Sequence, residues 1–182
     1  MRNPIYCLGL LAAGAAGVFL YGSSFRSACF AEVENFAQTL PGFSLKDPAD
    51  GEHTHDQCCK TGCVLIITIP NVKHGEHQSR WSKWLTKKPW PEQGPALILI
   101  EDLSQSNVKE KALASMKKSF KPGKIPLLLL DHTGAVRKAL RVQNDETVVL
   151  IFNKEGKLVL AEEAPPTLES AKKVRKFAEQ MK

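Results

Sequence analysis

The apolar stretch at residues 64–69 predicts the central strand of the fold. It is continuous and rich in β-branched side chains, which is typical of a strand buried on both faces of a sheet. Pro70 and Asn71 end it, because both residues favour turns. Beyond the turn, apolar residues recur at the spacing of one helical face: Trp81, Trp84 and Leu85. A buried strand, a polar turn and a helix form the first half of a βαβ unit, and α/β proteins place ligands at such turns.

The remaining apolar runs alternate in type along the chain. Further strands are predicted at residues 96–101, 126–130, 147–152 and 157–161. Helical spacing is found in Val108, Ala112, Met116 and Phe120, in residues 135–140, and in Leu168, Ala171, Val174 and Phe177. Thr167 stands where the last helix needs an N-cap. The predicted order is β-α-β-α-β-α-β-β-α, which is an α/β fold.

Two segments of the chain resemble a known family. Residues 125–139 (IPLLLLDHTGAVRKA) and residues 147–157 (TVVLIFNKEGK) are similar to consecutive segments of peroxiredoxins. The chain therefore resembles the redoxin (peroxiredoxin, AhpC-TSA-like) branch of the thioredoxin-like superfamily. Asp131, Gly134 and residues 137–139 are also similar to YtfJ-like periplasmic proteins. The resemblance implies a thioredoxin-like fold: a central mixed sheet flanked by helices, with a C-terminal β-hairpin and helix.

The resemblance also implies a reactive cysteine that this chain does not contain. In redoxins that cysteine follows the first buried strand and stands at the start of the next helix, where the helix dipole stabilises a thiolate. Here residues 70–77 contain no cysteine, and His74 or His77 takes the redoxin-site position. We therefore expect the fold without its standard peroxidase and dithiol chemistry.

A cluster of reactive side chains precedes the central strand: His53, His55, Cys58, Cys59 and Cys63. Three uses of this cluster remain open. Cys63 can form a structural disulfide with Cys59, or with Cys58. Cys59 and Cys63 can instead form a redox pair, with Cys58 as a third thiol. The two histidines and three cysteines also offer the soft donors that Zn²⁺ or Cu⁺ prefers, and no other cofactor is expected.

The N-terminal residues are predicted to lie outside the domain. Residues 5–21 are apolar and uncharged and follow Arg2, as in a signal peptide or an N-terminal membrane anchor. We expect a leader at 1–31, a linker at 32–42 and a thioredoxin-like domain at 43–182. The protein is then periplasmic, or anchored in the inner membrane and facing the periplasm, and it contacts the membrane only through an uncleaved leader.

These observations predict a cell-envelope protein that binds rather than catalyses. The main hypothesis is a non-catalytic binding or scaffold module with an unidentified protein partner. The alternative is a thiol-disulfide oxidoreductase that uses Cys59 and Cys63, or Cys58, and the second alternative is a metal-binding protein. The net charge of +6 comes without an aromatic and arginine-rich stripe, so no nucleic-acid partner is expected.

Overall fold

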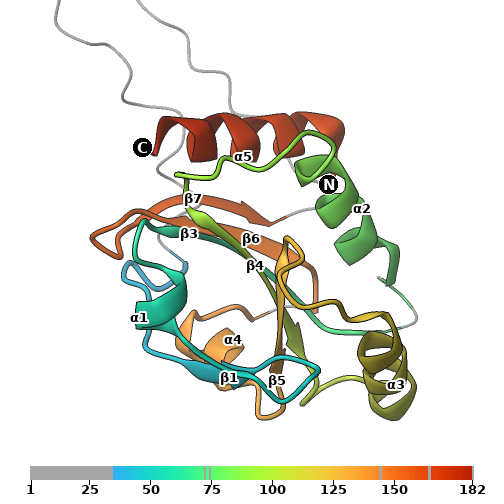
Figure 1. Cartoon of the computed structure of the whole chain (residues 1–182). Coiled ribbons are helices and arrows are strands. Elements are labelled where there is room, and N and C mark those ends of the chain that lie inside the picture. Colours follow the sequence, from blue (N-terminus) through green and yellow to red (C-terminus); the bar gives the residue numbers. More distant parts are fainter. Residues whose placement is uncertain (1–34, 72, 74, 144, 164, 182) are drawn as a thin grey trace, which may run out of the picture.

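The computed structural model describes residues 35–71, 73, 75–143, 145–163 and 165–181. The predicted leader, residues 1–31, lies outside this part of the chain. Within it, no helix has the length and apolar character needed to cross a membrane. The elements in chain order (Figure 1) are β1 (Ser44–Lys46), β2 (Glu52–Thr54), α1 (His55–Cys58), β3 (Cys63–Thr68), α2 (Gly75–Leu85), β4 (Ala96–Asp102), α3 (Lys109–Ser119), β5 (Leu127–Asp131), α4 (Ala135–Ala139), β6 (Val148–Phe152), β7 (Leu158–Glu163) and α5 (Leu168–Gln180).

The strands form one seven-stranded mixed sheet in the order β2-β1-β5-β4-β3-β6-β7. The three strands β3, β4 and β5 are parallel, and β6 runs antiparallel to β3. The two outer pairs, β1 with β2 and β6 with β7, are antiparallel. The carboxyl ends of the parallel strands therefore meet at one edge of the sheet, where α/β proteins place their sites.

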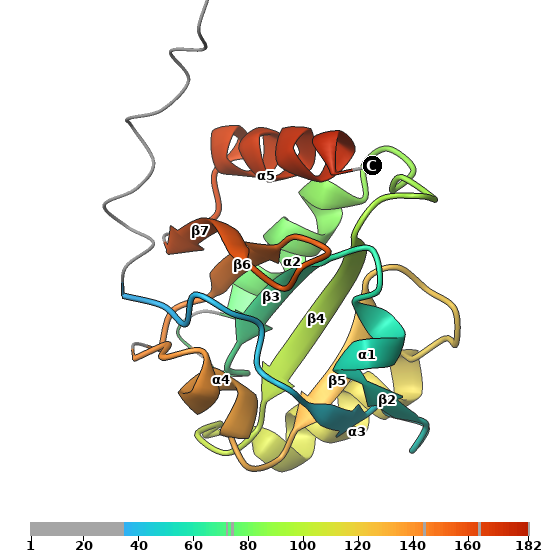
Figure 2. The ribbon, with the colours of Figure 1, turned by 90° about the vertical axis from the view of Figure 1, so that its left-hand side faces the viewer.

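Each face of the sheet carries its own apolar cluster. Leu65 and Ile67 of β3 belong to the cluster on one face, and Val64 and Ile66 belong to the cluster on the other. Helices α1 and α4 lie on the first side, and α2, α3 and α5 lie on the second (Figure 2). The predicted central strand, buried on both faces, is therefore confirmed.

The predicted order of elements is confirmed from the central strand to the last helix. Every predicted strand and helix in this region is present, and Thr167 caps α5 by accepting a hydrogen bond from the Ser170 amide at 3.0 Å. One predicted face is partly wrong, because Leu168 at the start of α5 is 51% exposed. Ala178 is buried in its place beside Ala171 and Val174.

The beginning of the domain differs from the prediction. Residues 35–42, expected as part of a linker, already pack against the sheet: Phe36 lies in the core, and the Leu40 amide donates to the Gly156 carbonyl at 2.8 Å. The hairpin of β1 and β2 and the short helix α1 were not predicted. Packing against the domain therefore begins before the expected boundary at Phe43.

Arg175 of α5 makes hydrogen bonds to the end of α2 and the loop that follows it. The Arg175 guanidinium donates to the carbonyl oxygens of Leu85, Lys88 and Pro89 at 2.8, 3.1 and 2.6 Å. It also lies 5.9 Å from the centre of the Trp90 ring, which is buried. The loop at residues 86–95 is thus tied to α5 through its backbone carbonyls.

Candidate functional site

The turn after β3 is where the resemblance to redoxins predicts the reactive site. β3 ends at Thr68, and α2 begins at Gly75. Of the two predicted residues for this position, His74 lies outside the described residues, and His77 is half-buried in the first turn of α2. Thr147, just before β6, donates from its hydroxyl to the Thr68 hydroxyl at 3.2 Å. The turn contains no thiol, and assigning His74 or His77 to the redoxin position stays a prediction.

Two carboxyl groups are buried at the same edge of the sheet. Glu101 and Asp102 end β4, and Glu101 is the register partner of Thr68. Glu101 is 1% exposed, its Oε2 has no hydrogen-bond partner in the described part of the chain, and burial raises the pKa of its carboxyl to about 8. Asp102 instead accepts hydrogen bonds from the amide and hydroxyl of Ser104 at 2.9 and 2.6 Å. The only sequence signal for a buried acid here is its place at the end of an apolar run.

The motif that resembles YtfJ-like proteins has a structural role in this fold. The Asp131 carboxylate accepts from the amides of Gly134 and Val136, each at 2.8 Å, and so closes the turn into α4. Gly134 has a φ of +70°, and a Cβ there would lie 2.5 Å from the Ser104 hydroxyl. Arg137 is buried, and its Nη2 donates to the Glu146 carbonyl at 3.1 Å. These contacts connect the ends of β4, β5 and β6.

The cysteine cluster lies at the opposite end of β3 from the redoxin position. Cys58 ends α1, Cys59 follows as its C-cap, and Cys63 is the first residue of β3. Cys59 is 8% exposed and Cys63 is 0% exposed, and both lie in the apolar core, although polar residues surround Cys59 in the sequence. The cause is packing of the unpredicted N-terminal elements, because Phe36 and Phe43 lie in the same core cluster.

The environments of Cys63 and Cys58 oppose ionisation of these two thiols. A hydrogen bond with Cys59, followed by burial, raises the pKa of the Cys63 thiol far above its usual range. Burial also raises the pKa of Cys58, which is half-buried. All three thiols are free in this structure, so the predicted Cys59–Cys63 disulfide is not formed here, and this pairing stays a prediction. The thiolate needed for exchange is disfavoured at each position with a raised pKa.

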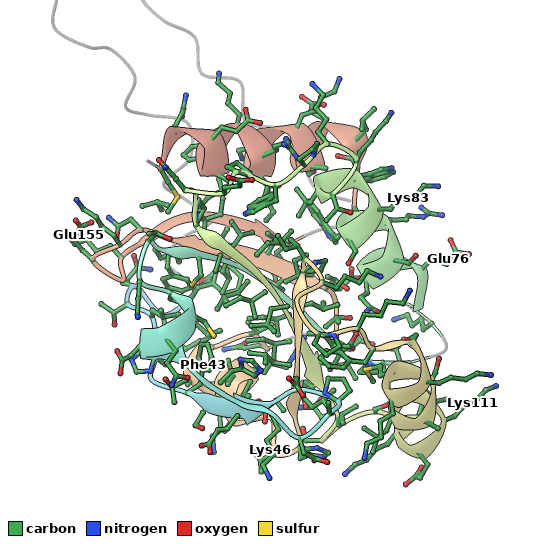
Figure 3. All side chains as sticks on the ribbon, in the orientation of Figure 1. Phe43, Lys46, Glu76, Lys83, Lys111 and Glu155 are labelled. Carbon is green, nitrogen blue, oxygen red and sulfur yellow. The ribbon has the colours of Figure 1, made fainter. Side chains whose placement is uncertain are left out.

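The two histidines of the cluster have other partners. His53 Nε2 lies 2.9 Å from the Asp47 carboxylate, and His55 Nε2 lies 3.1 Å from Asp56. The His55 ring also packs against Phe43, whose place between α1 and β1 is labelled in Figure 3. Across the ranges that the structure describes, no three or more His, Cys, Asp or Glu side chains form a group that could hold a metal ion. The five predicted donors are therefore not assembled into a Zn²⁺ or Cu⁺ site in this conformation.

A groove on the other face of the sheet was not predicted. It has a volume of about 380 Å³ and lies between α2 and α3, with Leu99 and Leu128 of the sheet among its lining residues. Met116 and Phe120 were predicted as the apolar face of α3, but no residue of α3 is fully buried. The only sequence signal was the low number of large apolar residues in that helix, which leaves the face incompletely packed.

Comparison with known proteins shows which solved structures have a similar fold. No family model matches the chain, and no curated protein matches its sequence. Among solved structures, the pneumococcal exposed lipoprotein thioredoxin Etrx1 from Streptococcus pneumoniae is similar with a TM-score of 0.58 and 11% identity, over 75% of this chain and 99% of that chain. The putative thiol:disulfide interchange protein DsbE from Chlorobium tepidum has a TM-score of 0.59 and 13% identity, over 80% of this chain and 96% of that chain.

A third similar structure gives the same result at higher identity. The putative protein disulfide isomerase from Bacteroides thetaiotaomicron has a TM-score of 0.57 and 22% identity, over 79% of this chain and 88% of that chain. All three are similar over nearly the whole described domain, and the strand order agrees with the α/β architecture predicted from the sequence. The protein therefore has a thioredoxin-like fold.

Proposed function

We propose that this protein is a binding module that keeps the thioredoxin-like fold without its thiol chemistry. One observation carries the proposal: the turn between β3 and α2, where redoxins place their nucleophile, contains no cysteine. Exchange and peroxide reduction both begin with a thiolate, and nothing else in that turn supplies one. What remains is a rigid sheet with a helix-lined face, which suits recognition of a protein partner.

The cysteines at the other end of β3 do not replace the missing thiol. A catalytic thiol must be reached by its substrate, but the Cys59 and Cys63 side chains lie in the core. A thiol with a raised pKa also presents little thiolate at neutral pH. The buried pair is thus better suited to packing than to turnover.

The first test measures thiol chemistry in the purified protein. We expect the rates of insulin disulfide reduction with dithiothreitol, and of peroxide consumption with a thioredoxin system, to equal those of buffer alone. The Cys58→Ala variant tests whether any turnover comes from Cys58, because Cys58 is the most exposed of the three described thiols. Turnover that is present in the wild type and lost in this variant, or in Cys59→Ala, would refute the proposal.

A thiol-disulfide oxidoreductase is the second candidate, and one contact favours it. The Cys59 and Cys63 thiols are hydrogen-bonded to each other, so a small movement of Cys59 could bring the sulfurs to bonding distance. The similar structures named above are described as a thioredoxin, a thiol:disulfide interchange protein and a protein disulfide isomerase. Under this candidate, the disulfide of a partner protein would take two electrons and two protons from the Cys59 and Cys63 thiols, so that the partner is left with two thiols and Cys59 is linked to Cys63. A thiol reductant would then restore both thiols.

Location outside the cytoplasm completes the proposal. The apolar, uncharged residues 5–21 support export or anchoring. One of the similar structures is, by its name, an exposed lipoprotein. Fusion of residues 1–35 to alkaline phosphatase, which is active only where its own disulfides form, is expected to give activity. The same fusion with two arginines inserted into residues 5–21 should be inactive, and equal activity of the two fusions would contradict export.

A further inference from the structure

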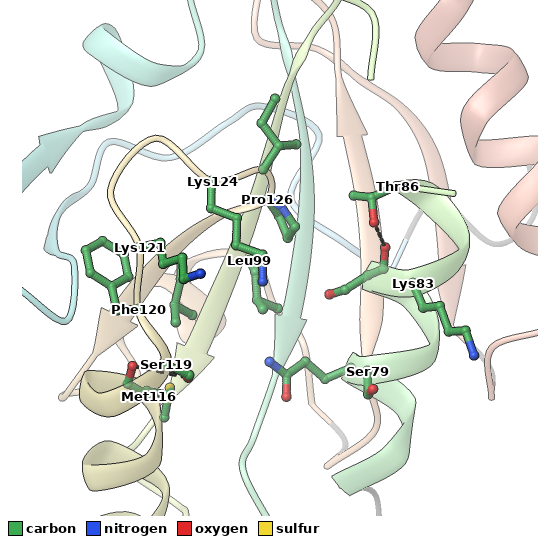
Figure 4. Close-up of a pocket in the computed structure, with 14 residues that line it drawn as sticks. Ser79, Lys83, Thr86, Leu99, Met116, Ser119, Phe120, Lys121, Lys124 and Pro126 are labelled. Carbon is green, nitrogen blue, oxygen red and sulfur yellow. Dashed lines mark hydrogen bonds between the residues drawn. The ribbon is translucent and has the colours of Figure 1, made fainter. Parts of the chain in front are cut away.

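The groove between α2 and α3 has two walls of different character. Figure 4 shows Ser79, Lys83 and Thr86 of α2 along one wall, and Met116 and Phe120 along the other. The apolar floor comes from the sheet face beneath. A groove of about 380 Å³ falls within the range typical of ligand sites, about 300–1,000 Å³.

The charge of the groove is entirely positive. Three of its lining residues are lysines, Lys83, Lys121 and Lys124, and no lining residue is acidic. In Figure 4 the side chains of Lys121 and Lys124 reach towards the middle of the groove, whereas Lys83 points away from it. No ion pair joins Lys121 or Lys124 to an acid in the part of the chain that the structure describes. Both ammonium groups are therefore available to bind an anionic partner.

The groove also offers apolar contacts and neutral hydrogen-bonding groups. Ile125 at its rim is 49% exposed, an unusual position for a large aliphatic side chain. Met116 can adapt to different apolar shapes because its side chain is flexible. Gln78, Ser79 and Ser82 also line the groove, and their side chains make no hydrogen bond within the described residues. Such groups suit the amides of a peptide backbone, whereas an alkyl chain would leave them unpaired.

We propose that this groove binds an extended acidic peptide segment of a partner protein, with a carboxylate held by Lys121 and Lys124 and an apolar side chain on the floor. The proposal rests on the binding function above and identifies the chemistry of the partner. Residues 1–31 of this chain do not fit that chemistry, because they contain Arg2 and Arg26 and no acidic residue.

The test uses a fluorescein-labelled eight-residue peptide that alternates aspartate or glutamate with leucine or phenylalanine. Its anisotropy is measured against the full chain, beside two matched peptides: one with lysine for each acid, the other with serine for each apolar residue. We expect binding of the first peptide only, and at least about tenfold weaker binding to the Lys121→Glu/Lys124→Glu variant. The Lys111→Glu/Lys138→Glu variant has the same net charge change outside the groove and should bind like the wild type.

Each other outcome overturns the assignment of the groove. If both double variants bound the acidic peptide equally weakly, the effect would be one of net charge and not of the groove. If the wild type bound the lysine peptide as tightly as the acidic peptide, the groove would not recognise charge. Binding of phosphatidylglycerol vesicles or dodecanoate that Lys121→Glu/Lys124→Glu abolishes, without peptide binding, would assign the groove to a lipid. None of these results depends on thiols, so failure here is distinct from the thiol turnover that would refute the proposed function.

Discussion

Replacing Glu101 with glutamine is expected to remove a decline in stability that the wild-type protein shows as the pH rises from about 4.5 to about 8. Burial at the end of β4 raises the pKa of the Glu101 carboxyl from 4.5 to about 8. In this interval the folded protein keeps the proton and the unfolded chain loses it. Each pH unit then lowers the free energy of unfolding by about 1.4 kcal/mol, so the total loss is several kcal/mol.

The sign follows from a folded-state pKa that lies above the unfolded one. The stabilising contribution is complete below the unfolded pKa and is lost as the pH approaches the folded pKa. Above it, the folded protein holds a buried charge that bears the full desolvation cost. Glutamine is neutral and nearly isosteric, so Glu101→Gln should equal the wild type near pH 4.5 and exceed it above pH 8.

Urea unfolding measured from pH 4 to pH 9 tests this expectation. The quantity of interest is the difference in the free energy of unfolding between variant and wild type at each pH, because other titrating groups cancel in it. Glu110→Gln in α3 removes an exposed carboxyl and should keep the wild-type pH dependence. A Glu101→Gln curve parallel to the wild type over the whole range would show that Glu101 ionises normally in the folded protein.

The fold could be predicted from the sequence wherever an apolar run was long enough to identify a strand or a helix. The six residues of β3 and the seven of β4 are nearly all buried, and continuous apolar runs of this length between turn residues are typical of buried strands. β1 and β2 have only three residues each and no apolar alternation. They form through tertiary pairing, such as that of Lys46 with Leu130 of β5, which no local pattern reveals.

Only one feature of the candidate site could be predicted from the sequence, namely the absence of a cysteine from the turn after the central strand. The missing cysteine is visible in the sequence, because a strand and a helix bracket the turn. The burial of Cys59 was not visible, since its neighbours Asp56 and Gln57 are polar and the core cluster that it joins includes Phe36 and Phe43 from earlier in the chain. The groove was also hidden, because α2 and the residues after α3 meet only in the folded protein.

Alkylation of the reduced, native protein is expected to reach Cys63 at least about a thousandfold more slowly than in the unfolded chain. Cys63 is 0% exposed at the start of β3, where β4 and β6 flank it as register neighbours. A reagent can reach it only when the sheet opens, which costs much of the free energy of unfolding. Cys58 is half-buried at the end of α1, so its protection should be far weaker.

Iodoacetamide labelling followed by peptide mapping measures each site separately, so Cys7 and Cys29 do not interfere. In guanidinium chloride, Cys58, Cys59 and Cys63 should react at similar rates, which gives the reference for protection. The Cys58→Ser variant should leave the protection of Cys63 unchanged, because that protection comes from the sheet. Native labelling of Cys63 as fast as Cys58 would mean that this end of β3 opens readily. An accessible Cys59 and Cys63 pair would then favour the oxidoreductase over the binding module.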